Sequence, residues 1–93
     1  MKVIIRETAG ADLKRIYDWI AKDSPPNAKS VVNRILDAIE IKIPAFPYIG
    51  RKGKIDGTRE WIVRGLPYLI IYRVDDEREA VTVLGVMHGA QNR

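Results

Sequence analysis

The sequence predicts a single α+β domain in which a helical hairpin packs against an antiparallel sheet. Three observations lead to this prediction. A β-prone segment over residues 2–7 opens the chain, two segments with helical periodicity follow over residues 9–21 and 24–43, and three β-prone segments complete it. The predicted order is β-α-α-β-β-β, and residues 1–93 fit one domain of ordinary size.

Both helices are predicted from apolar residues at helical spacing. In the first helix the apolar stripe consists of Leu13, Ile16, Tyr17 and Ile20. Thr8 is its expected N-cap, and Trp19 is expected to cover the margin of the stripe. The second helix begins after Ser24 with Pro25 in its first turn, and Pro44 is expected to stop it. Because the link between them is short, the helices are expected to form an antiparallel scaffold.

The three C-terminal strands are predicted from side-chain alternation and from turn residues. A loop rich in glycine and proline over residues 45–57 leads into an alternating segment over residues 58–64. The nearly continuous apolar run 68–74 is expected to be a central strand that is covered on both faces, and residues 80–87 form the last strand. Short turns between these strands imply an antiparallel meander.

Composition excludes several classes of protein. The chain has no cysteine and one histidine, so we expect no disulfide, no metal site and no cofactor. The common nucleophile, phosphate-loop and dinucleotide motifs are absent, so we expect no small-molecule substrate. The N-terminus is charged too early for a signal peptide, and no apolar run approaches the ~20 residues of a membrane span. A cytoplasmic protein that does not bind membranes is therefore expected.

Charge is distributed unevenly along the chain, whose formal net charge is +4. Residues 50–64 carry five cations and two anions, whereas residues 75–79 carry four anions and one cation. A basic patch beside an acidic turn suits a nucleic acid or an acidic protein partner. The alternative is a solvated surface with unevenly charged loops.

Candidate binding residues gather in the basic segment and the strand after it. They are Arg51, Lys52, Lys54, Arg59, Trp61 and Tyr68. Arginine can hold a phosphate bidentately, so Arg59 is either an anchor for phosphate or an acidic partner, or forms with Glu60 a salt-bridge network that fixes the loop to the sheet. The loop cations could equally be solvated. The two aromatic residues and Tyr72 could line a core or groove instead of stacking on bases.

If the chain is an enzyme, the candidate catalytic residues are Arg59, Arg64 and His88. Arginine stabilises charge that develops on a phosphate, and histidine moves protons near neutral pH. His88 directly follows the last predicted strand, where a hydrogen-bonded structural histidine is the alternative.

Short motifs along nearly the whole chain carry a family resemblance. They are Ala11-Asp12-Leu13-Lys14-Arg15-Ile16-Tyr17 with Trp19-Ile20, Phe46-Pro47-Tyr48-Ile49-Gly50-Arg51, Gly57-Thr58-Arg59-Glu60, Leu66-Pro67-Tyr68-Leu69-Ile70-Ile71-Tyr72-Arg73-Val74 and Val83-Leu84-Gly85-Val86-Met87-His88-Gly89-Ala90. In this order they resemble the RelE/ParE superfamily of toxins from bacterial type II toxin–antitoxin systems. The resemblance implies the β-α-α-β-β-β fold. It also implies a cognate antitoxin that wraps the helical hairpin and sheet and neutralises the basic patch.

The resemblance implies two kinds of target. RelE-like members cleave mRNA in the ribosome, whereas ParE-like members bind DNA gyrase and trap its DNA complex. This chain has Glu60, Ile62 and Leu69 where RelE-type nucleases commonly carry Lys, Lys and Arg, although Arg64 remains and His88 lies near a catalytic histidine of some relatives. The expected function is therefore ParE-like inhibition of growth through gyrase. The alternatives are a ribosome-dependent mRNA endonuclease and a degenerate toxin that retains only antitoxin binding.

Overall fold

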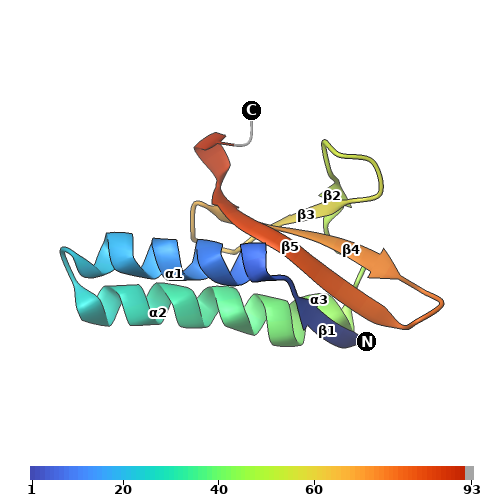
Figure 1. Cartoon of the computed structure of the whole chain (residues 1–93), viewed down its shortest axis with the longest axis horizontal. Helices are drawn as coiled ribbons and strands as arrows, with labels where there is room; N and C mark the ends of the chain where they lie inside the picture. Colours follow the sequence, from blue (N-terminus) through green and yellow to red (C-terminus); the bar gives the residue numbers. More distant parts are fainter. Residues whose placement is uncertain (92–93) are drawn as a thin grey trace.

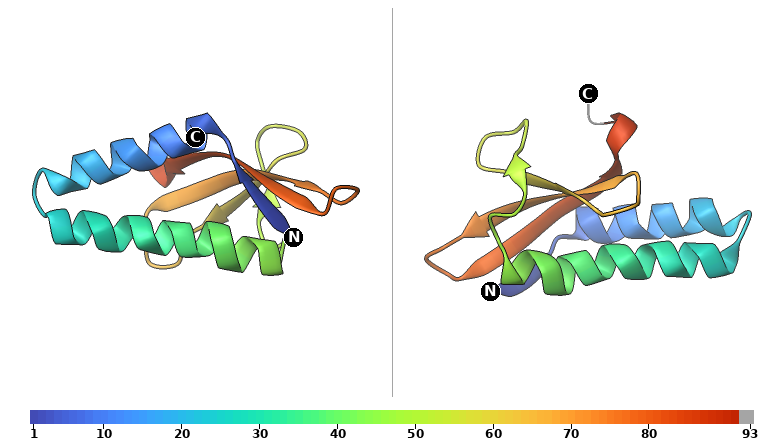
Figure 2. Two further views of the ribbon diagram at one scale, coloured as in Figure 1. Left: turned by 60° about the horizontal axis from the view of Figure 1, so that its bottom comes forward. Right: turned by 180° about the vertical axis from the view of Figure 1, so that it is seen from behind.

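A helical hairpin lies against one face of a five-stranded sheet in the computed structural model, which describes residues 1–91 (Figure 1). Helix α1 (Glu7–Ala21) and helix α2 (Pro25–Asp37) run antiparallel beside each other in every view (Figure 2). The α1–α2 turn and the turn between the last two strands lie at opposite ends of the long axis (Figure 1). The predicted α+β class and the hairpin-on-sheet arrangement are confirmed.

The sheet has the order β1-β5-β4-β3-β2. Its strands are β1 (Lys2–Ile5), β2 (Arg51–Lys52), β3 (Arg59–Ile62), β4 (Tyr68–Asp75) and β5 (Ala80–His88). The predicted meander of the last three strands is confirmed, with β4 at the centre. The sheet is mixed, however, because β1 pairs with β5 in parallel, and part of the predicted loop forms the additional edge strand β2.

Helix α1 begins without the predicted cap. Its first helical residue is Glu7, and the N-cap position belongs to Arg6, which makes no side-chain capping hydrogen bond. Thr8 is instead the second residue of the helix, and its Oγ1 donates to the Leu84 carbonyl oxygen of β5 at 2.6 Å. The predicted cap of α2 is confirmed, since the Ser24 hydroxyl accepts a hydrogen bond from the backbone N–H of Asn27.

Helix α2 continues beyond Asp37 through a π-helical turn (Ala38–Lys42) and the short α3 (Ile43–Ala45). The prediction that Pro44 stops the helix is therefore wrong. Pro44 occupies the first turn of α3, where a missing N–H is tolerated. Fully buried isoleucines recur every four residues at Ile35, Ile39 and Ile43. In an α-helix of 3.6 residues per turn such a series drifts around the axis, and the wider π turn corrects the drift.

The core lies between the two layers. Its helical members are Ala9, Leu13, Val31, Ile35, Ala38, Ile39 and Ile43, and its sheet members are Val63, Ile70, Tyr72, Val81, Val83 and Val86. Trp19 is 68% exposed, so it does not cover the margin of the α1 stripe as predicted. Its indole lies beside the Lys22 ammonium, which is 5.2 Å from the ring centroid.

Side chains of α1 hold an irregularity of β5 in place. The β4 partners pass from Gly85 to Val83 between Ile71 and Tyr72, so Leu84 is skipped in the register. Besides the Thr8 bond to Leu84, Asp12 Oδ2 accepts from the backbone N–H of Val86 at 3.0 Å. A Cβ on Gly85 would lie 3.1 Å from the same carboxylate oxygen, so glycine leaves space for this approach.

Replacing Asp12 by Ala is expected to lower the free energy of unfolding by about 1–2 kcal/mol, because the N–H of Val86 loses its acceptor. Urea unfolding measures the change. The control is Asp18→Ala, which removes only an exposed helix pair with Lys14 and is expected to cost about 0.5 kcal/mol or less. Asp12→Asn retains an acceptor oxygen and should restore most of the loss. Equal losses for the two alanine variants would contradict this role of Asp12.

Candidate functional site

A buried tyrosine attaches the basic loop to the sheet. Tyr72 on β4 is fully buried, and its hydroxyl donates to the Pro47 carbonyl oxygen at 2.7 Å and accepts from the Gly50 N–H at 2.9 Å. A Cβ on Gly50 would lie 2.6 Å from this hydroxyl, so the backbone can come this close only at glycine. Burial raises the pKa of Tyr72, while the Gly50 N–H and the Arg59 charge oppose the rise.

The arginines of this region hold the same loop. Glu60 is 5% exposed and accepts from Arg51 Nη2 at 3.2 Å and from the Lys54 backbone N–H at 3.2 Å. Arg59 Nη1 donates to the Gly50 carbonyl oxygen at 2.7 Å. The network foreseen as the structural alternative is thus present, although Arg51 rather than Arg59 pairs with Glu60. Two of the candidate cations therefore bind protein atoms.

The acidic turn meets the basic loop directly. The Tyr48 hydroxyl is hydrogen-bonded to an Asp76 carboxylate oxygen, and this bond is the main cause of the raised pKa of Tyr48. The Arg59 guanidinium lies over the Tyr48 ring, 4.7 Å from its centroid. Lys52 lines a hollow of ≈ 320 Å³ together with these two side chains. The basic and acidic segments of the sequence are therefore neighbours, and they face each other across Tyr48.

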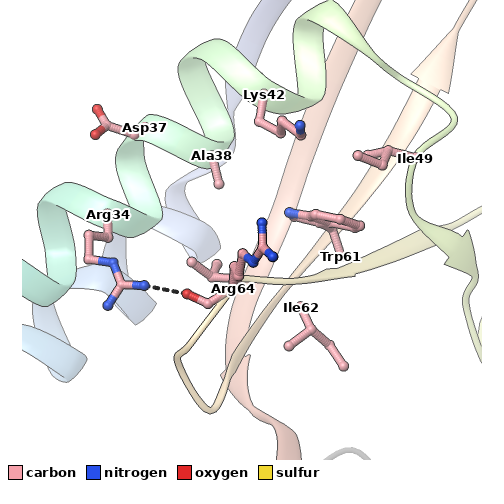
Figure 3. A pocket seen from close by; sticks show the side chains of 9 residues that line it. Arg34, Asp37, Ala38, Lys42, Ile49, Trp61, Ile62 and Arg64 are labelled. Carbon is pink, nitrogen blue, oxygen red and sulfur yellow. Dashed lines mark hydrogen bonds between the residues drawn. The ribbon is translucent and has the colours of Figure 1, made fainter.

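Trp61 and Arg64 line a groove of ≈ 580 Å³ between α2 and β3 (Figure 3). The other lining residues are Arg34, Asp37, Ala38, Lys42, Ile49, Ile62 and Val63. Arg34 Nη2 is hydrogen-bonded to the backbone carbonyl of Arg64, which attaches the β3–β4 turn to α2. The Arg64 guanidinium points into the groove beside Trp61 (Figure 3). This groove is the candidate site that combines cations with an apolar floor.

Tyr68 and His88 lie in a second hollow of ≈ 300 Å³ against α1. Their rings pack edge to face with centroids 5.6 Å apart. His88 Nδ1 accepts from the Ala90 N–H at 3.1 Å, so the neutral ring carries its proton on Nε2. Arg15 and Trp19 complete this hollow. His88 is thus hydrogen-bonded locally and open to solvent, which is compatible with both a catalytic and a structural histidine.

The three candidate catalytic residues line different parts of the surface. Arg59 pairs with Tyr72 of β4. Tyr72 lies four residues, or ~13 Å, along this strand from Tyr68, which marks the position of the other two candidates. Arg64 and His88 lie on opposite sides of β4, because Val63 and His88 both neighbour Tyr68. Arg64 faces the α2 groove and His88 faces the α1 hollow. A single phosphate could not contact all three side chains in this arrangement.

Of the nine residues that line the groove, sequence reasoning proposed only Trp61 and Arg64 for a site, and it missed the cations Arg34 and Lys42. The two cations were overlooked because α2 was interpreted as scaffold alone. The available signal for a second functional face of α2 was a series at four-residue spacing, Arg34, Ala38 and Lys42. Each of these residues directly precedes one of the core isoleucines. Within residues 1–91 no group of three or more His, Asp or Glu side chains could hold a metal, and no helix has the length and apolar character of a membrane span.

Comparison with known proteins identifies the family. The family model described as "ParE toxin of type II toxin-antitoxin system, parDE" matches residues 3–93. The chain belongs to the ParE toxin family. A curated relative in Sinorhizobium fredii, named "Putative toxin Y4kP", is 39% identical over 79 residues, which cover 85% of this chain and 78% of the relative. The chain is therefore a type II toxin–antitoxin toxin of the ParE/RelE superfamily.

Solved structures of toxin–antitoxin proteins share the fold. A chain of the chromosomal ParDE system from P. aeruginosa has a TM-score of 0.76 at 21% identity, with 95% of both chains covered. A chain of the RelBE2 complex from Mycobacterium tuberculosis has a TM-score of 0.70 at 24% identity, with 94% of this chain and 88% of that chain covered. The E. coli RelBE complex gives 0.60 at 16% identity, with 94% of both chains covered. These likenesses confirm the predicted RelE/ParE-like fold.

Replacing Tyr72 by Phe is expected to lower the free energy of unfolding of this ParE-family chain by about 1–3 kcal/mol, because two backbone groups of the loop lose their partner. Chemical unfolding at pH 7 measures the loss. Tyr17→Phe is the control, since Tyr17 is 38% exposed and its hydroxyl makes no hydrogen bond within residues 1–91. Equal stability of the two variants would contradict the role of Tyr72.

The stability difference between the wild-type chain and Tyr72→Phe is expected to depend on pH. The pKa of Tyr72 is raised above 10.0 in the folded state, so the unfolded tyrosine loses its proton first as pH rises. The stabilisation from Tyr72 is present in full below pH 10 and is lost as pH rises through the raised pKa. The stability difference between the wild-type chain and Tyr72→Phe should therefore shrink above pH 10. A difference that stays constant or grows there would contradict the raised pKa.

Proposed function

We propose that this toxin acts in the ParE-like manner, by binding DNA gyrase, and that a cognate antitoxin neutralises it. The observation that carries the proposal is the composition of one sheet face. Glu60 and Ile62 are two residues apart on β3 and therefore point to the same face of the sheet. Ile62 pairs with Leu69 of β4, so all three side chains share this face. RelE-type nucleases commonly have cations at these positions. Here Glu60 and Leu69 are buried and Ile62 is 51% exposed.

The chemistry of RNA cleavage supports the same choice. A nuclease must stabilise charge that develops on the phosphate and must move protons within one site. The remaining candidates are Arg59, Arg64 and His88, which line separate hollows. Arg59 is also occupied by the Gly50 carbonyl and the Tyr48 ring. A toxin that acts by binding requires no such convergence.

The antitoxin is proposed from the family and from the surface. The M. tuberculosis RelBE2 and E. coli RelBE structures are toxin–antitoxin complexes. The chain is basic, with a formal net charge of +4, and it leaves large apolar side chains exposed, among them Ile41, Phe46 and Ile55. An acidic partner with apolar side chains would cover both features. Because gyrase acts on intracellular DNA, the proposal places the toxin in the cytoplasm.

Purified toxin is expected to abolish DNA supercoiling by gyrase and to accumulate cleaved DNA, because a trapped gyrase–DNA complex cannot reseal its substrate. A supercoiling assay with titrated toxin measures both effects. Added cognate antitoxin should restore activity. Full gyrase activity in the presence of excess toxin would refute the proposed target.

Induction of the toxin alone separates the competing functions. The gyrase proposal predicts growth arrest with a DNA-damage response and an unchanged primer-extension pattern on mRNA. Codon-localised mRNA cuts that disappear in Arg64→Ala and His88→Ala would instead establish the nuclease. Normal growth in the absence of antitoxin would establish a degenerate toxin that only binds its partner.

A further inference from the structure

We infer that α1 is a self-association surface, through which two copies of this chain form a symmetric dimer. In the dimer the two α1 helices run antiparallel, and Trp19 of each copy enters the hollow beside α1 of the other. This hollow shares no lining residue with the α2–β3 groove, and the inference does not depend on gyrase as the target. Its basis is an exposed tryptophan beside an apolar hollow, on a helix face whose charges complement one another.

Trp19 is the most exposed large apolar side chain among residues 1–91, with 68% of its surface open to solvent. It lies near the end of α1, and the α1–α2 turn that follows extends beyond the sheet (Figure 1). The Lys22 ammonium, 5.2 Å from the ring centroid, leaves most of the indole uncovered. Tryptophan is enriched among the few residues that dominate binding at interfaces. Trp19 is therefore suited to be the anchor of an interface.

The hollow beside Trp19 suits an aromatic ring. Its volume is ≈ 300 Å³, and an apolar cavity of about 150 Å³ already holds benzene. Tyr68 and His88 line it with rings that pack edge to face, and Ile16 and Val86 contribute aliphatic surface. The indole of Trp19 is part of the lining. Because the anchor and the hollow belong to one patch, a second copy offers both at once.

A two-fold axis matches the exposed face of α1 to itself. Four side chains recur at spacings of three, four and three residues and therefore share one helix face, namely Asp12, Arg15, Trp19 and Lys22. When two such helices run antiparallel about the midpoint between Arg15 and Trp19, Arg15 lies opposite the partner's Trp19. Asp12 then lies opposite the partner's Lys22. The first contact is a cation–π interaction and the second an ion pair, and each occurs twice, as a two-fold interface requires.

The same axis brings the anchor to the hollow. Arg15 lines the hollow, so the partner's Trp19, which lies opposite Arg15, is placed beside it. Asp12 retains 23% of its side-chain surface although it binds the Val86 N–H, so the partner's Lys22 can reach its carboxylate. One register thus satisfies the charged pair and the apolar anchor together.

The charge of this face favours a second copy over a nucleic acid. Arg15 Nη1 pairs with Asp12 Oδ1 at 2.9 Å, and Lys14 Nζ pairs with Asp18 Oδ2 at 2.9 Å. Most of the charge is therefore balanced along the helix, whereas a phosphate backbone is bound through an excess of cations. A surface that carries both signs is complemented by a surface of the same composition.

Sedimentation equilibrium of the purified toxin tests the dimer. The apparent mass should rise from that of one chain toward that of two at about 10–100 μM, because a pair of helices buries less than a standard interface. Trp19→Ala should weaken association about tenfold or more, since it removes the anchor from both halves of the interface. Ile41→Ala is the matched control. Ile41 is 67% exposed and does not belong to α1, so its replacement should change the dissociation constant less than about twofold.

A charge reversal tests the register of the two helices. Lys22→Glu places an anion opposite the partner's Asp12, so the dissociation constant of the dimer should rise about fivefold or more. Lys29→Glu makes the same change in net charge on an exposed part of α2 and should leave the constant within about twofold. A general effect of net charge would instead strengthen the association of two cationic copies in both variants.

Fluorescence reports whether Trp19 itself becomes covered. The chain has two tryptophans, so Trp61→Phe leaves Trp19 as the only one. Its emission should shift to shorter wavelength, and its quenching by acrylamide should fall, as the concentration rises through the dissociation constant. If Trp61→Phe does not fold, the same titration of the wild-type chain records the change, and Trp19→Ala should abolish it.

Three results would overturn the inference. They are a monomer at all concentrations up to about 1 mM, equal effects of Trp19→Ala and Ile41→Ala on association, and a dimer in which Trp19 stays as accessible to acrylamide as in the monomer. A duplex oligonucleotide that protected Trp19 of the monomer would also overturn it, because the face would then bind nucleic acid. The supercoiling assay is a separate measurement, so failure of the dimer leaves the gyrase proposal standing.

Discussion

The hydroxyl of Tyr72 is the interaction on which the arrangement of the basic segment depends. One buried oxygen binds Pro47 and Gly50, and so fixes the start of a loop that would otherwise cross the sheet edge unattached. Arg59 and Arg51 then find their partners in Gly50 and Glu60. The strand β2, the Tyr48 ring and its contact with the acidic turn follow from this attachment. A single phenol thus organises much of the half of the sheet farthest from β1.

Positive charge serves two different purposes in this protein. Around β2 and β3 the arginines form hydrogen bonds and an ion pair within the protein, because a loop with three glycines has few apolar side chains that could fix it. On the other side of β3, Arg64 lines a groove with apolar surface, together with Arg34, which is hydrogen-bonded to the Arg64 carbonyl, and Lys42, whose ammonium lies over the Phe46 ring. The density of cations in the sequence therefore marks the stiffened loop, while the surface suited to recognition combines cations from two elements.

Much of the fold was predictable because periodicity reports directly on burial. The cap at Ser24, the β3-β4-β5 meander and the α1 stripe at Leu13, Ile16 and Ile20 were correct, whereas Tyr17 of the predicted stripe is exposed. Local patterns do not encode long-range partners, so the parallel pairing of β1, the bond from Thr8 to Leu84 and the strand at Arg51 were not foreseen. Trp61 and Arg64 were identified as candidates from their own segment of the sequence. Arg34 and Lys42 approach them only in three dimensions, so they were not foreseen.

The pairing of β1 with β5 also sets the order in which the protein can be completed. Lys2 is aligned with Ala80, so the first strand made at the ribosome must wait for the last one, β5. Contacts so distant in sequence are slow to form because a long loop must close first. Helices α1 and α2 are joined by a short turn and pack on each other, so their contacts can form earlier in synthesis. A growing chain of this toxin can therefore pair its two helices before it acquires a finished sheet.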